Sequence, residues 1–266
     1  MLNLTQSPLF VIAGPCVIES AETCLVIGRR VKEICDSLGL TYIFKASFDK
    51  ANRSSVNSFR GPGLEDGLVV LKRVKEELGV PVLTDVHEVA QVAEAATVVD
   101  ILQVPAFLAR QTDLLAACGR TGKTVNVKKG QFMAPAEMGN AIEKIKSSGG
   151  SQILLTERGS FFGYNRLVND FTALPQMKSF GCPVIFDITH STQQPAAQGN
   201  QSGGNPQYSP MLARAAVAAG VDGLFLECHP DPSKARSDAA TMLDFATVER
   251  LLTECRQIAD LRANWK

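Results

Sequence analysis

The amino-acid sequence predicts an α/β fold, namely a single (β/α)8 TIM barrel with a short N-terminal extension. Eight short apolar runs alternate with longer amphipathic segments along the chain, a pattern typical of parallel strands joined by helical crossovers. The length of 266 residues suits such a barrel, for which about 250 residues is typical. No linker, repeat or low-complexity block divides the sequence. We therefore expect residues 1–266 to form one catalytic domain, with eight strands favouring a closed barrel over an open sheet.

The predicted strands are short apolar runs, and the predicted helices carry apolar residues at helical spacing. Strands are expected at residues 9–13, 41–44, 81–84, 101–104, 124–127, 152–156, 183–187 and 223–227. Helices are expected at residues 21–38, 64–78, 87–96, 134–147, 209–219 and 245–263. Glycines stand where helices should end, just before the next strand, at Gly39, Gly79, Gly149, Gly181 and Gly220. Glycine adopts the left-handed backbone that often terminates a helix.

Composition and charge exclude several classes of partner. Lysine and arginine together equal aspartate and glutamate in number, so the formal net charge is zero, and we expect no nucleic-acid or membrane partner. No apolar run approaches the ~20 residues of a membrane span, and residues 1–8 lack the features of a signal peptide. The seven cysteines form no CxxC pair. These observations predict a cytoplasmic protein whose cysteines are mostly small buried hydrophobes.

In a (β/α)8 barrel the chemistry lies at the carboxyl ends of the strands. Here every predicted strand ends in polar or ionisable residues. In strand order, these ends include Cys16, then Lys45 with Lys50 to Ser55, Asp85 with His87, Gln103 with Arg110, Lys128 with Lys129, Glu157 with Arg158, Asp187 with His190, and Glu227 with Asp238. Since the eight ends share one rim, a purely structural explanation for all of them is unsatisfactory.

The first group on this rim is cationic. Lys45, Lys50, Arg53, Lys128 and Arg158 follow three different strands, and Arg110, which follows a fourth, is a sixth candidate. Lysine offers a point charge, and arginine offers a planar fork that fits phosphate or carboxylate oxygens in pairs. Each cation alone is also consistent with a weak surface ion pair. Their convergence predicts a site for small ligands that carry phosphate and carboxylate groups.

The second group contains possible metal ligands. Cys16, His190, Glu227 and Asp238 come from strands one, seven and eight, and the first and last strands of a closed barrel are neighbours. A thiolate, an imidazole and two carboxylates suit a divalent ion such as Zn²⁺, Fe²⁺ or Mn²⁺. Each residue alone also has a structural explanation, because a cysteine after Gly-Pro often packs in a core and a lone histidine often only donates a hydrogen bond.

Five motifs, KASFDKANRSS, VNVKKGQF, TERGSFFGY, FDITHSTQ and ECHPDPSKARSD, occur in this order after successive strands. Together they resemble the 3-deoxy-D-manno-octulosonate 8-phosphate synthases over nearly the whole barrel. The resemblance implies an enzyme that joins phosphoenolpyruvate to D-arabinose 5-phosphate and water and releases inorganic phosphate, on the route to the lipopolysaccharide inner core. It also implies a homotetramer.

The same resemblance implies roles for single residues. Asn52 would bind the sugar near its reacting end, while Arg53 and Ser54 hold its phosphate, and Arg110 would reach that phosphate from a neighbouring subunit. The phosphoenolpyruvate side would be formed by Lys45, Lys50, Gln103, the backbone around Ala106, Lys128 and Arg158. Lys50 would protonate the aldehyde oxygen. Candidates for handling the proton of the attacking water are Asp85, His87 and Glu227, with phosphate binding as an alternative for His87.

Four points are left for the structure and for experiment. Cys16 stands where a metal-independent branch of the family has asparagine, so the resemblance implies the metal-dependent branch. Related enzymes that use erythrose 4-phosphate carry Lys-Pro-Arg-Thr where this chain has Lys-Ala-Asn-Arg-Ser. The alternative functions are therefore a synthase that uses erythrose 4-phosphate, a sialic-acid-type synthase, and a phosphosugar-binding barrel without catalytic activity. Only one of the adjacent Lys128 and Lys129 side chains is expected inside the barrel. The glycine-rich segment 198–207 is expected to be mobile and to close over the site.

Overall fold

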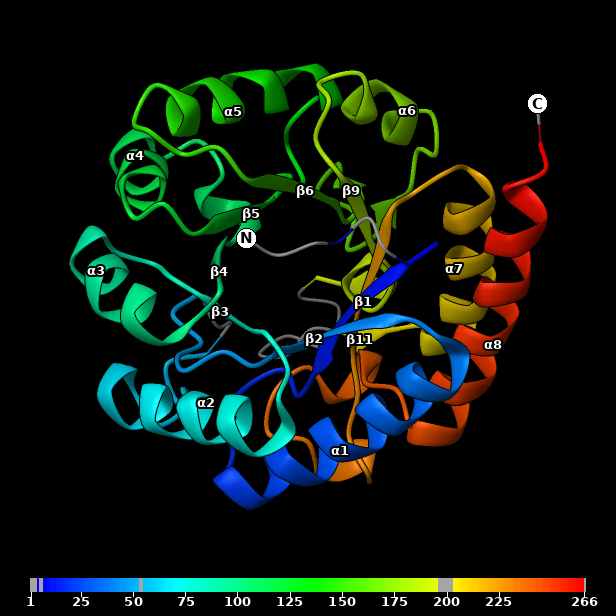
Figure 1. The fold of residues 1–266 in the computed structure, drawn as a ribbon, viewed down its shortest axis with the longest axis horizontal. Coiled ribbons are helices and arrows are strands. Elements are labelled where there is room, and N and C mark those ends of the chain that lie inside the picture. Colours follow the sequence, from blue (N-terminus) through cyan, green and yellow to red (C-terminus); the bar gives the residue numbers. More distant parts are fainter. Residues whose placement is uncertain (1–3, 5–6, 53–54, 196–202, 266) are drawn as a thin grey trace.

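The computed structural model describes residue 4 and residues 7–52, 55–195 and 203–265. Its centre is a closed barrel of eight parallel strands in the order β1-β12-β9-β6-β5-β4-β3-β2, with the helices forming a ring outside it (Figure 1). The predicted (β/α)8 barrel is thereby confirmed. The barrel strands are β1 (Phe10–Gly14), β2 (Thr41–Lys45), β3 (Val82–Asp85), β4 (Ile101–Val104), β5 (Thr124–Lys128), β6 (Ile153–Glu157), β9 (Val184–Asp187) and β12 (Gly223–Glu227).

The outer ring follows the strands in chain order. Its helices are α1 (Ala21–Leu38), α2 (Leu64–Leu78), α3 (Val89–Val98), α4 (Thr112–Arg120), α5 (Met138–Lys146), α6 (Ala173–Lys178), α7 (Ser209–Ala218) and α8 (Phe245–Arg262). Two small hairpins, β7 (Ser160–Phe161) with β8 (Leu167–Val168) and β10 (Gln193–Gln194) with β11 (Gly203–Gly204), lie in loops after barrel strands. No helix in the described part of the chain combines the length and the apolarity that crossing a membrane requires.

Helix ends differ from the sequence-based ranges in instructive ways. Helix α3 begins at Val89 and leaves His87 in the loop, because Glu88 and Gln91 form a capping box. Gly39 and Gly79 cap α1 and α2 in the left-handed conformation, as predicted. The predicted caps at Gly149, Gly181 and Gly220 are wrong in position: these glycines have positive φ, but the cap residues of α5, α6 and α7 are Ser147, Ser179 and Ala219.

The interior of the barrel has two layers. The lower layer is apolar and is closed from below by Leu4 of the N-terminal extension; it consists of Phe10, Ile12, Ile43, Leu83, Ile101, Leu154, Ile185 and Phe225. Side chains two residues apart on a strand face the same side. Two residues beyond six of these positions, six polar side chains therefore form the upper layer: Lys45, Asp85, Gln103, Thr156, Asp187 and Glu227, all buried. This upper layer is the floor of the site.

One close backbone approach supports that floor. A Cβ atom placed on Gly14, the last residue of β1, would lie 2.0 Å from the carbonyl oxygen of Lys45. Only glycine allows β1 and β2 to approach so closely at this point. The position of the Lys45 side chain in the upper layer thus depends on the missing side chain of Gly14.

Candidate active site

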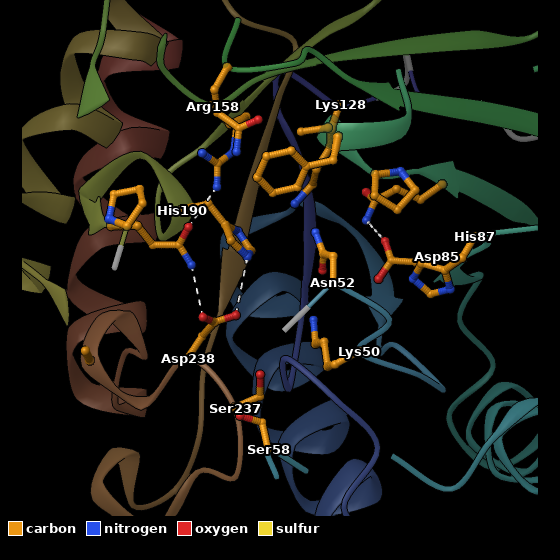
Figure 2. Close-up of a pocket in the computed structure, with 18 of the residues that line it drawn as sticks. Lys50, Asn52, Ser58, Asp85, His87, Lys128, Arg158, His190, Ser237 and Asp238 are labelled. Atoms are coloured by element: carbon orange, nitrogen blue, oxygen red, sulfur yellow. Dashed lines mark hydrogen bonds and ion pairs between the residues drawn. The ribbon is translucent and has the colours of Figure 1, made fainter. Parts of the chain in front are cut away.

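A pocket of about 430 Å³ opens at the carboxyl ends of the strands. Figure 2 shows Lys50, Asn52, Lys128 and Arg158 around this pocket. Lys50 and Asn52 follow β2, Lys128 ends β5, and Arg158 follows β6. Eleven predicted site residues line it: Lys45, Lys50, Asn52, Asp85, His87, Gln103, Ala106, Lys128, Arg158, His190 and Asp238. The sequence-based expectation that strand-end residues meet at one rim is confirmed for these positions. Arg53 and Ser54 lie outside the described residues.

Two buried ion pairs form the floor of the pocket. Lys45 Nζ lies 2.6 Å from Glu227 Oε1, and both side chains are only 1% exposed. Lys128 Nζ lies 2.6 Å from Asp187 Oδ2 and 3.6 Å from the centre of the Phe225 ring. The ammonium groups therefore have carboxylate partners on the floor, and Lys128 lies directly over the ring of Phe225, a member of the apolar lower layer.

The floor carboxylates are ionised. Burial alone would raise the pKa of Glu227, but the charges of Lys45, His190 and Lys50 lower it to about 2. For Asp187, likewise, burial is outweighed by His190 and Lys128, which hold its pKa well below the usual range. Each carboxylate keeps its ionised form because a cation is paired with it.

Four potential metal ligands converge beside this floor. Cys16 Sγ lies 3.1 Å from Asp238 Oδ2 although the two residues are 222 positions apart in the chain. His190 Nε2 lies 3.7 Å from Glu227 Oε2 and 3.9 Å from Asp238 Oδ2. Ligand atoms of Cys16, Glu227 and Asp238 all lie within 4.8 Å of one another. Such spacings of about 3–4 Å are those of neighbouring ligands at 2.0–2.3 Å from one shared ion.

The orientation of His190 and the state of Cys16 also fit a cation. His190 Nδ1 lies 3.0 Å from Asp187 Oδ1, so Nε2 faces the acidic groups, as in metal sites where a carboxylate orients the histidine. Burial and the nearby charges of Asp238 and Glu227 raise the pKa of the Cys16 thiol. Glu227 Oε2 is buried and lacks a hydrogen-bond partner among the described residues. A bound cation would compensate the two carboxylates and favour loss of the thiol proton, so that all three groups could act as ligands.

Asp238 is held in an unusual conformation. It has φ 50° and ψ 29°, the left-handed region that few residues other than glycine adopt. Its Oδ1 atom accepts a hydrogen bond from Gln193 Nε2 at 3.0 Å, and Gln193 Oε1 accepts one from Arg158 Nη2 at 2.8 Å. A non-glycine residue in this region at a functional site is strained. Gln193 thus connects the candidate metal ligand to Arg158, a cation of the pocket.

The remaining proton-handling candidates differ in their surroundings. Asp85 accepts hydrogen bonds from Ser47 Oγ and Gln103 Nε2; burial opposes ionisation, but Lys45 and Lys50 hold the pKa of Asp85 well below the usual range. His87 packs edge-on against Phe48, and burial lowers its pKa, which keeps the ring neutral. A neutral imidazole is a stronger base than a strongly stabilised carboxylate.

The surroundings of Lys50 favour its charged ammonium form. Burial acts to lower its pKa, but the acidic groups of Cys16, Glu227 and Asp85 around it raise the pKa well above the ordinary value. The loop after β2 places the side chain at the pocket wall. Lys50 therefore presents an ammonium group, and so a proton donor, to any bound ligand.

The adjacent lysines after β5 are distinguished by the structure. Lys128 faces the pocket, whereas Lys129 Nζ donates to the Met133 carbonyl oxygen at 3.1 Å and lies 3.5 Å from Glu157 Oε2. Because Glu157 Oε1 accepts the backbone N–H groups of Arg158 and Gly159, this second pair holds the loop that carries Arg158. Lys129 is a structural residue.

Arg110 does not line the pocket of its own chain. It is exposed, and it lines a separate cavity beside Glu137 and Lys144. Its predicted role in a neighbouring subunit stays a prediction.

Several pocket residues were not predicted from the sequence. They are uncharged or lie on long loops: Ser58, Phe59, Phe107, Gln131, Phe161, Gln193, Pro195 and Arg236. Arg236 lies over the Phe59 ring at 3.6 Å, a contact between residues far apart in the chain. Gln131 and Gln193 stand within the recognisable motifs, and this was the one signal that could have identified them.

Comparisons with known proteins agree with this geometry. Residues 4–263 match the model of the DAHP synthetase I family. The 2-dehydro-3-deoxyphosphooctonate aldolase of Cyanothece sp. is 57% identical over 93% of this chain and 90% of the relative. Those of Thioalkalivibrio sulfidiphilus and Xylella fastidiosa are 52% and 58% identical, over 96% and 93% of this chain and 91% and 90% of theirs. The chain therefore belongs to the DAHP synthetase I family and, within it, to the 2-dehydro-3-deoxyphosphooctonate aldolases, which are the synthases that its motifs resemble.

Proposed function

We propose that this enzyme condenses phosphoenolpyruvate with D-arabinose 5-phosphate and water to give 3-deoxy-D-manno-octulosonate 8-phosphate and inorganic phosphate, in lipopolysaccharide synthesis, and that it uses a divalent metal ion. The observation that carries the proposal is the state of Arg158. Its Nη2 atom is held by Gln193, while Nη1 is buried without a hydrogen-bond partner among the described residues. A buried guanidinium with a free donor in a pocket calls for an anionic ligand.

The cations around the pocket suit phosphoenolpyruvate. Arg158, Lys128 and Lys50 are near enough to share its carboxylate and phosphate, since all three line one pocket of about 430 Å³. Fixing the enol against the aldehyde removes much of the entropic barrier, about 7–11 kcal/mol in favourable cases. Asn52, on the loop that also carries Arg53 and Ser54, faces the sugar, in agreement with the five-carbon substrate of this family.

The reaction is balanced by these groups. The C3 carbon of phosphoenolpyruvate forms a bond to the aldehyde carbon, and Lys50 gives a proton to the aldehyde oxygen. Water adds to the cationic C2 carbon, and its proton passes to a base. The resulting hemiketal phosphate loses inorganic phosphate by C–O cleavage. Among the candidate bases we assign the water proton to His87, because Glu227 is paired with Lys45 and Asp85 is stabilised as an anion.

The proposed metal site consists of Cys16, His190, Glu227 and Asp238. Its support is the convergence of their ligand atoms, the orientation of His190 by Asp187 and the Glu227 Oε2 atom, which has no hydrogen-bond partner among the described residues. Zn²⁺, Fe²⁺ or Mn²⁺ suits this donor set. When bound, such an ion supplies an acidified water molecule and a point that orients polar groups of the sugar. The protein residues hold the reactants in either case.

We propose a homotetramer and a cytoplasmic location as well. An exposed Arg110 outside the pocket of its own chain is available to a neighbouring subunit, and all seven cysteines are free thiols, as in a reducing compartment. Sedimentation of the purified protein, with an Arg110→Ala variant assayed for its KM for the sugar, tests both subunit claims. A monomer with full activity would contradict them.

The function is tested by phosphate release from phosphoenolpyruvate. We expect release with arabinose 5-phosphate, little with erythrose 4-phosphate, and loss of activity in a strong chelator with recovery on adding Zn²⁺, Fe²⁺ or Mn²⁺. Lys50→Met should abolish release, whereas Lys72→Met, at an exposed ion pair, should not. Preference for erythrose 4-phosphate would reverse the substrate assignment, and full activity after verified metal removal would contradict the metal requirement.

A further inference from the structure

A chain of hydrogen bonds crosses the barrel interior below the pocket. Thr156 Oγ1 donates to Asn126 Oδ1 at 2.8 Å, and Asn126 Nδ2 donates to Gln103 Oε1 at 2.8 Å. Gln103 Nε2 then donates to Asp85 Oδ1. The four residues stand on four neighbouring strands, β6, β5, β4 and β3, and Thr156 and Asn126 have no exposed surface at all. Neither of these two residues lines the pocket.

The direction of this chain is the same at every link. The carboxylate of Asp85 can only accept hydrogen bonds, so Gln103 must turn its NH2 group towards Asp85 and its oxygen towards Asn126. That oxygen needs a donor, so Asn126 must turn its own NH2 group towards Gln103. The Asn126 oxygen then faces Thr156, whose hydroxyl donates. Reversing any one amide would place two acceptors against each other.

This order decides what Gln103 presents to the pocket. An amide nitrogen carries two hydrogens, and one of those on Gln103 is bonded to Asp85. The amide oxygen is occupied by Asn126, while the Gln103 side chain lines the pocket. The group left for a ligand is therefore the second N–H, a donor that suits an anion and would be replaced by a repelling oxygen if the amide turned over.

We propose that Asn126 and Thr156 are positioning residues for phosphoenolpyruvate binding, acting through Gln103. This inference rests on the proposed function, since it assigns the anionic ligand of that pocket. Thr156 holds the Asn126 amide in the direction that Asp85 sets, by donating to its oxygen, and Asn126 anchors the Gln103 oxygen. Neither residue touches the substrate, and both act by keeping one donor aimed at it.

The test makes the same threonine-to-valine substitution at two positions, Thr156 near the upper end of β6 and Thr124 at the lower end of β5. Thr156→Val removes the hydroxyl at nearly constant volume, and Thr156→Ser retains it. The matched control is Thr124→Val: Thr124 is also buried and donates to an amide oxygen, Gln152 Oε1, at 2.9 Å, but it stands two residues before Asn126, at the lower end of β5. We expect Thr156→Val to raise the KM for phosphoenolpyruvate roughly tenfold, the equivalent of one buried hydrogen bond.

The KM for arabinose 5-phosphate should stay unchanged in Thr156→Val, and Thr156→Ser and Thr124→Val should behave as the wild type. A wild-type KM for phosphoenolpyruvate in Thr156→Val, or an equal rise in Thr156→Ser or in Thr124→Val, would overturn the proposal. If Thr156→Val does not fold, Asn126→Asp replaces the donor by an acceptor at equal size and should weaken binding by roughly a hundredfold, since a charged acceptor then faces the Gln103 oxygen.

Calorimetric binding of phosphoenolpyruvate alone separates this inference from the proposed function. If the wild type binds phosphoenolpyruvate but releases no phosphate with arabinose 5-phosphate, the proposed function fails, and the comparison of Thr156→Val with Thr124→Val still decides the positioning role. If turnover is normal and binding is the same in all variants, the positioning role alone is refuted.

Discussion

Asp187 contacts both Lys128, a cation of the pocket, and His190, a candidate metal ligand. For this reason Asp187→Asn is the most informative single change. The carboxylate is fully buried and accepts from Lys128 Nζ at 2.6 Å on one side and from the ring and backbone nitrogens of His190, both at 3.0 Å, on the other. An asparagine has one acceptor oxygen where the aspartate has two. Its NH2 group must therefore face either an ammonium group or an N–H donor.

The magnitude follows from burial. Removing one partner of a buried ion pair costs about 3–5 kcal/mol in the free energy of unfolding, because the other charge stays behind without compensation. The matched control is Asp36→Asn, which breaks an exposed pair with Lys32 at 2.5 Å and should cost only ~0.2–1 kcal/mol. The loss of the His190 partner should also weaken binding of the proposed metal ion by about 10–100-fold.

Urea unfolding measures the first effect, and titration against a chelator of known affinity measures the second. We expect a much lower urea midpoint for Asp187→Asn than for Asp36→Asn, together with weaker binding of Zn²⁺. Equal midpoints for the two variants would refute the assignment of Asp187 as the buried counter-ion of Lys128. Unchanged Zn²⁺ affinity in a folded Asp187→Asn protein would refute its role in orienting His190.

Three further predictions concern the floor and the anion site. The pKa of Glu227 is about 2, below the ordinary 4.5, so the stabilising effect of its carboxylate should be complete above about pH 4.5 and be lost as the pH falls towards 2. The difference in urea midpoint between the wild type and Glu227→Gln should therefore shrink between about pH 4.5 and about pH 2. A difference that stays constant over this range would contradict the prediction. Gly14→Ala should lower the urea midpoint, since its new Cβ would lie 2.0 Å from the Lys45 carbonyl oxygen and such overpacking costs about 1–3 kcal/mol or more; a wild-type midpoint would refute the close approach. Arg158→Lys should raise the KM for phosphoenolpyruvate about tenfold with an unchanged KM for the sugar, because lysine lacks the planar fork. Steady-state kinetics with each substrate varied in turn measure the two constants, and an unchanged KM for phosphoenolpyruvate would contradict the prediction.

The barrel and most of its rim were predictable because parallel strands have simple rules. Once eight strands are recognised, their carboxyl ends share one face, and Cys16 and Asp238 meet despite a separation of 222 residues. The inner face of each strand was not predictable, because strands of a parallel barrel are buried on both sides and read as continuous apolar runs. For this reason the strand pattern alone did not separate Lys128 from Lys129, and only the family resemblance pointed to Lys128.

Residues on long loops were only partly predictable. Gln193 carries no charge and lies on a two-residue strand, so neither hydrophobic periodicity nor charge distinguishes it. Asp238 was predicted as a metal ligand although it stands eleven positions after the end of β12, but its left-handed backbone was not predicted. Arg53 and Ser54, and residues 198–202 of the segment expected to close over the site, lie outside the described residues. The described residues 203 and 204 of that segment form β11, which pairs with β10.

The two-layer interior has a consequence for how such a barrel can change over evolutionary time. The apolar lower layer, which includes Phe10, Leu83 and Leu154, forms one cluster of its own, and on six of the strands the polar side chains begin only two residues further along. Substitutions at the rim can therefore exchange one phosphosugar for another with little effect on the residues that hold the strands together. Stability and specificity are inherited through different positions of the same eight strands.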